Sequence, residues 1–255
     1  MNAITPNAFS TRAVLALYLR ETKYEFLRVL RSPAFSVPTL VFAPMFYLMF
    51  GVLLNRGNAQ AASYLMATYS VFGVMGPGLF GFGVGLAMDR ERGLLTLKRV
   101  QPVPALAPLL AKVGMAMIFA ACIGVMLVAL GMTLGGVEMK PSQVAVLLCV
   151  DVLGVVPFCA LGLLIGTLVS GNAAPAVVNL IYMPLALLSG LWLPLRMLPA
   201  VVQQVAPLWP SWHLGQLALK IVGQDSGTPA WMHVAVLLAF SAICLFLAQR
   251  RLQRS

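Results

Sequence analysis

The chain has 255 residues, of which 60% are hydrophobic and only 9% are charged. Soluble domains carry roughly 25% charged residues, so this composition, with a mean hydropathy of +0.92, excludes a soluble domain and indicates an integral membrane protein. The net charge of +10 would suggest nucleic acid in a soluble chain. Here it is informative through its position, because Lys and Arg stay on the cytoplasmic side of membranes.

The first predicted element covers Thr11 to Arg31, within an N-terminal region that we expect to be cytoplasmic (residues 1–36). Apolar residues recur there at helical spacing, and the polar side is basic. The basic residues are Arg12, Arg20, Lys23, Arg28 and Arg31. This pattern predicts an amphipathic helix along the cytoplasmic membrane surface; a solvated leader helix that only sets topology is the alternative. Met1 to Ser32 lacks the short apolar core of a cleavable signal peptide.

Six membrane-spanning helices are predicted, because a bilayer core needs about 20 apolar residues per helix. They cover residues 37–54, 61–88, 109–135, 143–169, 175–195 and 229–248. The fourth and fifth spans come from one long apolar run, and the polar, helix-breaking residues between Ser170 and Pro175 mark the turn between them. The fold class is therefore an all-α integral membrane protein with six transmembrane helices.

One further uncharged segment, Met197 to Leu219, contains prolines and polar side chains. These argue against a lipid-exposed helix, because each broken backbone bond in hydrocarbon needs a partner. We therefore expect residues 196–220 to form re-entrant or interfacial helices on the outer face. Six spans then place 13 of the 17 Lys and Arg residues on one side: five before the first span, five from Arg90 to Lys112 and three in the basic tail 249–255. The positive-inside rule makes that side, with both termini, cytoplasmic.

A charged segment, Asp89 to Pro104, follows the second span, within a predicted loop of residues 89–107. The preceding run from Gly57 to Met88 contains no Asp, Glu, Lys or Arg. Such a segment is typical of a loop in water between two spans. We interpret it as the part through which a soluble partner moves the membrane helices, with a solvated loop that only sets topology as the alternative.

Glycines and prolines inside the spans favour close packing and kinks. A literal GxGxxG occurs at Gly76, Gly78 and Gly81, but no strand precedes it and no acid is placed to hold a ribose, so dinucleotide binding is rejected. Small residues four apart let helices approach closely. The pairs are Gly81 with Gly85 and Gly162 with Gly166. Prolines within spans are expected to kink them or free a carbonyl. They are Pro44, Pro77, Pro157 and Pro184.

Few residues in the spans are candidates for chemistry. Asp151 is the only acid well inside a span; such acids are functional candidates, and we leave a functional and a structural role open. We expect Asp151 to face the bundle interior or a dimer seam. His213 and His233 lack a carboxylate or cysteine at ligand spacing, so no metal site is expected. The four cysteines lie in apolar runs and are interpreted as packing residues. No GxxxxGK[ST] loop occurs, so the chain is not expected to hydrolyse ATP.

Together these motifs carry a family resemblance. The order of short motifs along nearly the whole chain resembles the permease subunits of ABC-2 type transporters. The motifs are Arg28, Arg31, Pro33, Pro44, Phe50 and Gly51, then Asp89 to Gly93 with Leu97, Pro102 and Pro104, then Asn179, Pro184, Leu188 to Gly190, Leu198, Pro199 and Pro207 to His213.

The resemblance implies a connecting helix near the N-terminus and a coupling helix in the charged segment that docks on a separate ATPase. The connecting-helix residues would be Arg20, Lys23, Arg28 and Arg31. The coupling residues would be the charged Asp89, Arg90, Glu91 and Arg92, with Gly93, Leu94, Leu95 and Leu97. It also implies two ATPase subunits, which bind the ATP and Mg, and a second, identical permease chain in the bacterial inner membrane. Asp151, Asn179 and Ser189 are candidates for the pathway or the dimer seam.

Two other classes remain open. A six-span assembly factor of the cytochrome-maturation type handles haem, and its tryptophan-rich outer segment with paired histidines has only a weak parallel here. The corresponding residues are Trp192, Trp209, Trp212, His213 and Trp231. A gradient-driven carrier would be expected to show internal repeats and several intramembrane charges. For a permease, an amphipathic drug, lipid or lipid-linked glycan is the expected substrate class by analogy, and export is favoured over import.

Overall fold

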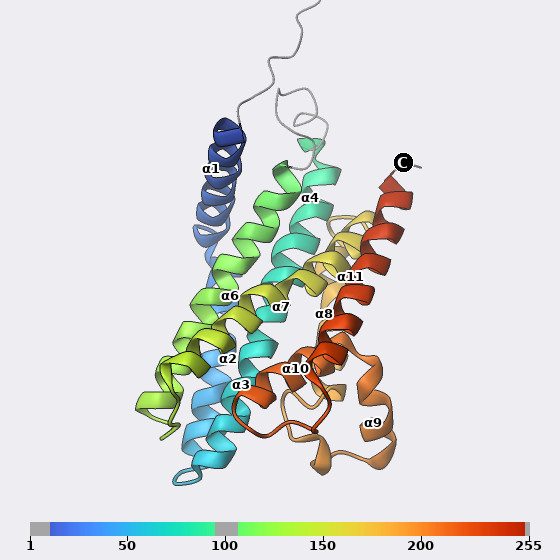
Figure 1. Cartoon of the computed structure of the whole chain (residues 1–255). Coiled ribbons are helices and arrows are strands. Elements are labelled where there is room, and N and C mark those ends of the chain that lie inside the picture. Colours follow the sequence, from blue (N-terminus) through green and yellow to red (C-terminus); the bar gives the residue numbers. More distant parts are fainter. Residues whose placement is uncertain (1–10, 95–106, 253–255) are drawn as a thin grey trace, which may run out of the picture.

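The computed structural model describes residues 11–94 and 107–252, and all of their regular elements are helices. Figure 1 shows them arranged as a bundle. In chain order the elements are α1 (Thr11–Leu30), α2 (Pro33–Phe46), η1 (Tyr47–Leu53), α3 (Ala59–Gly76), η2 (Pro77–Val84), α4 (Gly85–Glu91), α6 (Ala107–Thr133), α7 (Pro141–Leu168), α8 (Ala174–Leu188), η3 (Leu195–Met197), α9 (Ala200–Val205), η4 (Ala206–Leu208), α10 (Pro210–Ile221) and α11 (Ala230–Leu252).

Five helical segments of the described chain are long and apolar enough to cross a membrane. They are Pro33–Leu53, Ala59–Glu91, Ala107–Thr133, Pro141–Leu168 and Ala230–Arg251. The segment from Ala59 to Glu91 is central, because 78% of its apolar window is buried, against 22% for the last segment. Five of the six predicted spans therefore correspond to helices of sufficient length.

The remaining predicted span, residues 175–195, contains the shorter helix α8. Its 15 residues rise about 22 Å at 1.5 Å per residue, less than the roughly 30 Å of a bilayer core. The helix ends at Leu188 because Gly190 adopts a positive φ of 74°. Only glycine takes this left-handed conformation at little cost, and the apolar sequence pattern did not reveal the break.

The two ends of the bundle differ in what they contain. Figure 1 shows α1, α4 and the C-terminal end of α11 at one end, and α9 and α10 at the other. The basic residues of α1, α4 and α11 therefore gather at the same end of the molecule. This is the grouping that the charge distribution along the sequence predicted.

Helix α7 packs closely against η2 through glycines. A Cβ atom added to Gly162 would lie 2.5 Å from the carbonyl oxygen of Gly78, and one added to Gly166 would lie 2.8 Å from that of Gly83. Neither position accepts a side chain, so the prediction of close packing at Gly162 and Gly166 is confirmed.

Two of the four prolines that were predicted to kink a span or free a carbonyl lie at wide, π-helical turns. Pro44 lies one turn before η1, and Pro77 begins η2. π-Helical turns occur where the regular hydrogen-bond ladder of an α-helix is interrupted. Helices α7 and α8 instead continue through Pro157 and Pro184.

Candidate functional site

The charged segment begins inside a helix. Helix α4 extends the apolar run of η2 and ends at Glu91, so the first residues of the predicted 89–107 loop are helical. The helix ends because Gly93 has a positive φ of 70°, the conformation that commonly follows a helix C-terminus. Asp89 is buried at this end of the helix, whereas Glu91 and Arg92 are exposed.

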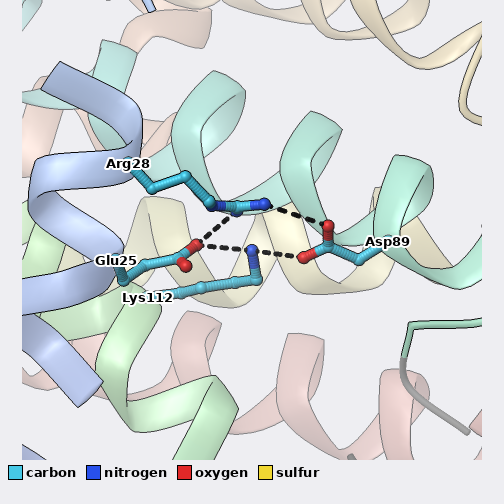
Figure 2. A network of polar contacts seen from close by, with 4 residues as sticks. All are labelled: Glu25, Arg28, Asp89 and Lys112. Carbon is cyan, nitrogen blue, oxygen red and sulfur yellow. Dashed lines mark hydrogen bonds and ion pairs between the residues drawn. The ribbon is translucent and has the colours of Figure 1, made fainter. Parts of the chain in front are cut away.

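Lys112, in the second turn of α6, lies between two carboxylates from two other helices. Its Nζ atom is 2.7 Å from Oε1 of Glu25 on α1 and 2.7 Å from Oδ2 of Asp89 on α4. Figure 2 shows the four side chains of this charge cluster pointing toward one another, with Arg28 on the other side of the two acids. Arg28 donates to Glu25 at 2.6 Å and to Asp89 at 3.3 Å. The cluster therefore joins α1, α4 and α6.

Burial distinguishes this cluster from a surface ion pair. The Lys112 side chain is 3% exposed, while Arg28 is 49% exposed. Burial by itself favours the neutral form of Glu25, but Lys112 and Arg28 outweigh it and lower the pKa of this carboxyl below its usual value. Burial also opposes the charge of Arg28, and Glu25 with Asp89 more than compensate, so the pKa of Arg28 is raised. Two cations and two anions thus leave the cluster neutral.

Arg90 connects α4 to a fourth helix. Its guanidinium donates to the carbonyl oxygens of Thr167 at 2.6 Å and Val169 at 3.0 Å, at the C-terminal end of α7. The last carbonyls of a helix lack intrahelical donors, and a cation there also interacts favourably with the helix dipole. Asp89 and Arg90 therefore bind within the chain, while the neighbouring Glu91 and Arg92 are exposed.

The other predicted residues of this end are placed as follows. Arg20, Lys23 and Arg31 of the α1 region are exposed. Gly93 and Leu94 are partly buried. Leu95 and Leu97, with most of the predicted coupling helix, lie outside the described residues.

Sequence reasoning missed the cluster itself. The sequence pattern marks Lys112 only as one of the basic residues that set topology, and it does not distinguish Glu25. A weak signal was present, since Lys112 is the only charged residue in the 27 residues of α6. A charge placed in an apolar helix requires a partner.

Comparison with known proteins identifies the family. A model of the ABC-2 type transporter family matches residues 17–222. The chain belongs to the ABC-2 type transporter family. Over 230 residues it is 30% identical to a protein of Bacillus subtilis (strain 168) named "Putative transport permease YvfS", with 88% of this chain and 92% of the relative covered. With its several apolar helices, the chain is a multi-pass membrane protein with the role of a transport permease.

The three candidate pathway residues of this ABC-2 permease lie in different places. Asp151, on α7, is fully buried, and Oγ of Ser70 on α3 lies 3.0 Å from its Oδ1. Ser189, at the end of α8, is buried against Oγ of Ser211. Asn179 is exposed on α8. The structure therefore does not bring them into one site.

Asn179 borders a cavity of about 280 Å³ between α2, α3, η2 and α8. The lining is mostly aromatic and aliphatic, and among the described residues Asn179 contributes the one side-chain amide. The lining residues are Ala34, Phe35, Pro38, Thr39, Phe42, Ala43, Phe72, Gly73, Gly76, Phe80, Asn179, Tyr182 and Met183. An apolar cavity with a few polar groups suits an amphipathic molecule.

The two histidines, far apart in the sequence, meet at the other end of the permease. Nδ1 of His213 on α10 lies 2.9 Å from Nδ1 of His233 on α11, and Nε2 of His213 donates to the carbonyl oxygen of Pro207 at 2.9 Å. Since Nε2 of His213 carries the proton, Nδ1 of a neutral His213 accepts from His233. No third His, Cys, Asp or Glu joins them within residues 11–94 and 107–252 to form a metal-binding group.

Proposed function

We propose that this ABC-2 permease is the membrane subunit of an ATP-driven exporter and that a separate ATPase binds at its charged segment. The main support is the charge cluster, because it bonds α4, the helix that leads into the charged segment, to α1 and α6 at once. A force applied at Glu91 and Arg92 would then move three helices together. ABC-2 permeases generally work with an ATPase, which would bind the ATP and Mg.

The internal partners of Asp89 and Arg90 refine which residues would contact the ATPase. Charges already bonded within the chain gain little from a partner, whereas exposed charges remain available to one. We therefore assign direct contact to Glu91 and Arg92, with Leu94, Leu95 and Leu97 as apolar anchors in a polar rim. Arg20, Lys23, Arg28 and Arg31 would belong to α1 as a connecting helix at the cytoplasmic end of the bundle, where α1 runs beside α6 (Figure 1).

The proposed topology has six crossings of a bacterial inner membrane and both termini in the cytoplasm. The sixth crossing would combine α8 with the turn that follows it, while residues 196–220 lie on the outer side. Gathering of the basic residues at the end that holds α1 and α4 supports this orientation through the positive-inside rule. Two identical permease chains would form the path, with the cavity beside Asn179 as part of it and an amphipathic substrate moving outward.

The test is co-purification from native membranes in mild detergent, followed by an ATP hydrolysis assay. We expect a roughly equimolar ATPase with the wild-type chain and its loss on Glu91→Arg. Glu138→Arg is the matched control, because Glu138 is also exposed but lies in the loop between α6 and α7, at the other end of the bundle. A chain that purifies alone and moves solute in vesicles without ATP would refute the proposal and favour a gradient-driven carrier.

A further inference from the structure

A second hollow lies between α7, α10 and α11, away from the charge cluster. This groove has a volume of about 450 Å³, and none of the described residues that line it is charged. The lining residues are Val146, Cys149, Val150, Leu153, Gly154, Val156, Pro157, Leu214, Leu217, Val234, Leu237, Leu238 and Ser241. Its single hydroxyl, on Ser241, donates to the carbonyl oxygen of Leu237 at 2.7 Å. The groove therefore offers no unused side-chain hydroxyl or charge to a polar ligand.

The helices leave this space because of how they cross. Near its C-terminal end, α11 packs on the later part of α7, where Ala248 belongs to the same buried cluster as Cys159 and Leu163. Toward the other end of the bundle the two helices diverge, and α10 lies between them (Figure 1). Leu214 and Leu217 of α10 form part of the groove wall. The result is a wedge-shaped recess.

The position of the groove along α11 places it at the depth of lipid tails. Trp231, at the start of α11, is 70% exposed, and exposed tryptophans are enriched at the membrane–water interface. The groove residues of α11 run from Val234 to Ser241, which is about 5–15 Å deeper at 1.5 Å per residue. Leu153 and Leu238 at the groove are 58% and 66% exposed, so it opens outward.

We propose that this groove binds one acyl chain of a membrane phospholipid, from the leaflet on the side of α10. Its size fits, since a cavity of about 150 Å³ holds one benzene molecule and a groove three times larger accommodates roughly 18 carbons. Only the assignment of this leaflet to the outer side rests on the proposed function.

Dispersion contacts would retain the chain in the groove. Leaving bulk lipid for another apolar surface brings no hydrophobic gain, so helices and lipids in membranes are held by close packing. A chain in the recess contacts α7, α10 and α11 at once, whereas a chain on a flat helix face contacts one side only. The groove should therefore retain a lipid that the rest of the apolar surface exchanges freely.

The test is native mass spectrometry of the purified chain, with palmitoyl-oleoyl phosphatidylglycerol added after delipidation. Leu238→Trp fills the groove from an exposed position, while Ile243→Trp is the matched control on the same helix, 59% exposed and outside the groove. We expect the lipid-bound species with the wild type and Ile243→Trp and its loss with Leu238→Trp. Equal binding by the two variants would overturn the proposal. Leu153→Trp, on the opposite wall, provides an independent second variant should Leu238→Trp fold poorly.

Two cysteines allow a second copy of the chain to be distinguished from a lipid. Cys149 lines the groove and Cys122, on α6, does not, and both are exposed. A phospholipid with a photoactivatable acyl chain should label peptides of α7 and α11 more strongly than those of α6, and uniform labelling would count against the groove. A disulfide between two copies through Cys149, formed faster than one through Cys122, would show a protein occupant and overturn the proposal. Neither readout requires an ATPase.

Discussion

Substitution of Lys112 by Met tests how much the charge cluster contributes to stability. Met keeps an unbranched side chain of similar size but leaves Glu25 and Asp89 with Arg28 as their only cation in the cluster. Removing one member of a buried ion pair costs about 3–5 kcal/mol, because the remaining charge stays buried without compensation. The Lys112 side chain is 3% exposed and bonds two carboxylates, so we expect Lys112→Met to lower the free energy of unfolding by that amount.

Two other substitutions provide the comparison. Arg28→Met removes a cation that is 49% exposed and should cost about 1 kcal/mol, the upper end for exposed pairs. Lys220→Met removes the partner of Asp225 at the same 2.7 Å distance as in the Lys112 pairs, but with 38% of the Lys220 side chain exposed, and should cost about 0–1 kcal/mol. Burial rather than distance would then account for the difference.

The assay is denaturant unfolding of the purified chain in mild detergent, followed by tryptophan fluorescence. A cost for Lys112→Met no greater than that for Lys220→Met would refute the reasoning. A further variant combines Lys112→Met with Glu25→Gln and Asp89→Asn. Both buried carboxylates are then neutral, and the one remaining charge, on Arg28, belongs to a side chain that is 49% exposed. This combination should therefore recover much of the lost stability; failure to recover would show that Lys112 acts through packing instead.

Three further predictions concern single positions. Gly162→Ala should lower the free energy of unfolding by about 1–3 kcal/mol, because the added methyl group overpacks the contact with η2. Gly76→Ala has nothing within 4 Å of its added Cβ, so it should leave the free energy of unfolding nearly unchanged in the same assay. Ser70 Oγ lies 3.0 Å from both Ala67 O and Asp151 Oδ1 but has only one hydrogen to donate. Asp151→Asn can donate to Ser70 in turn, so it should retain more stability than Asp151→Leu. Equal losses of unfolding free energy in the two variants would contradict this geometry. Burial lowers the pKa of His213 below 6.5, against a smaller rise from its bond to Pro207. The unfolded chain then binds the proton first, so the melting temperature should fall as pH drops from ~7 to ~5.5, and His213→Gln should reduce that fall.

Much of this permease could be predicted from composition and the order of residues along the chain. The membrane class, five of the helices and the gathering of basic residues at one end follow from runs of apolar residues and from charges, which are local properties. The glycines at 162 and 166 were predicted to pack closely because their four-residue spacing places them on one helix face. The family resemblance rested on similar local motifs in order.

The tertiary structure decided which distant residues meet. Glu25 and Lys112 are 87 positions apart, and they pair because the rotation and depth of α1 and α6 bring their side chains to the same point. Sequence periodicity shows which residues share one face of a helix, but not which other helix packs against that face. The same holds for His213 and His233, which meet at Nδ1. Even the length of α8 depended on the left-handed backbone of Gly190, one glycine among several in apolar runs. Local patterns therefore determined which segments are helices, whereas packing between helices determined which charges are buried and where the cavities open.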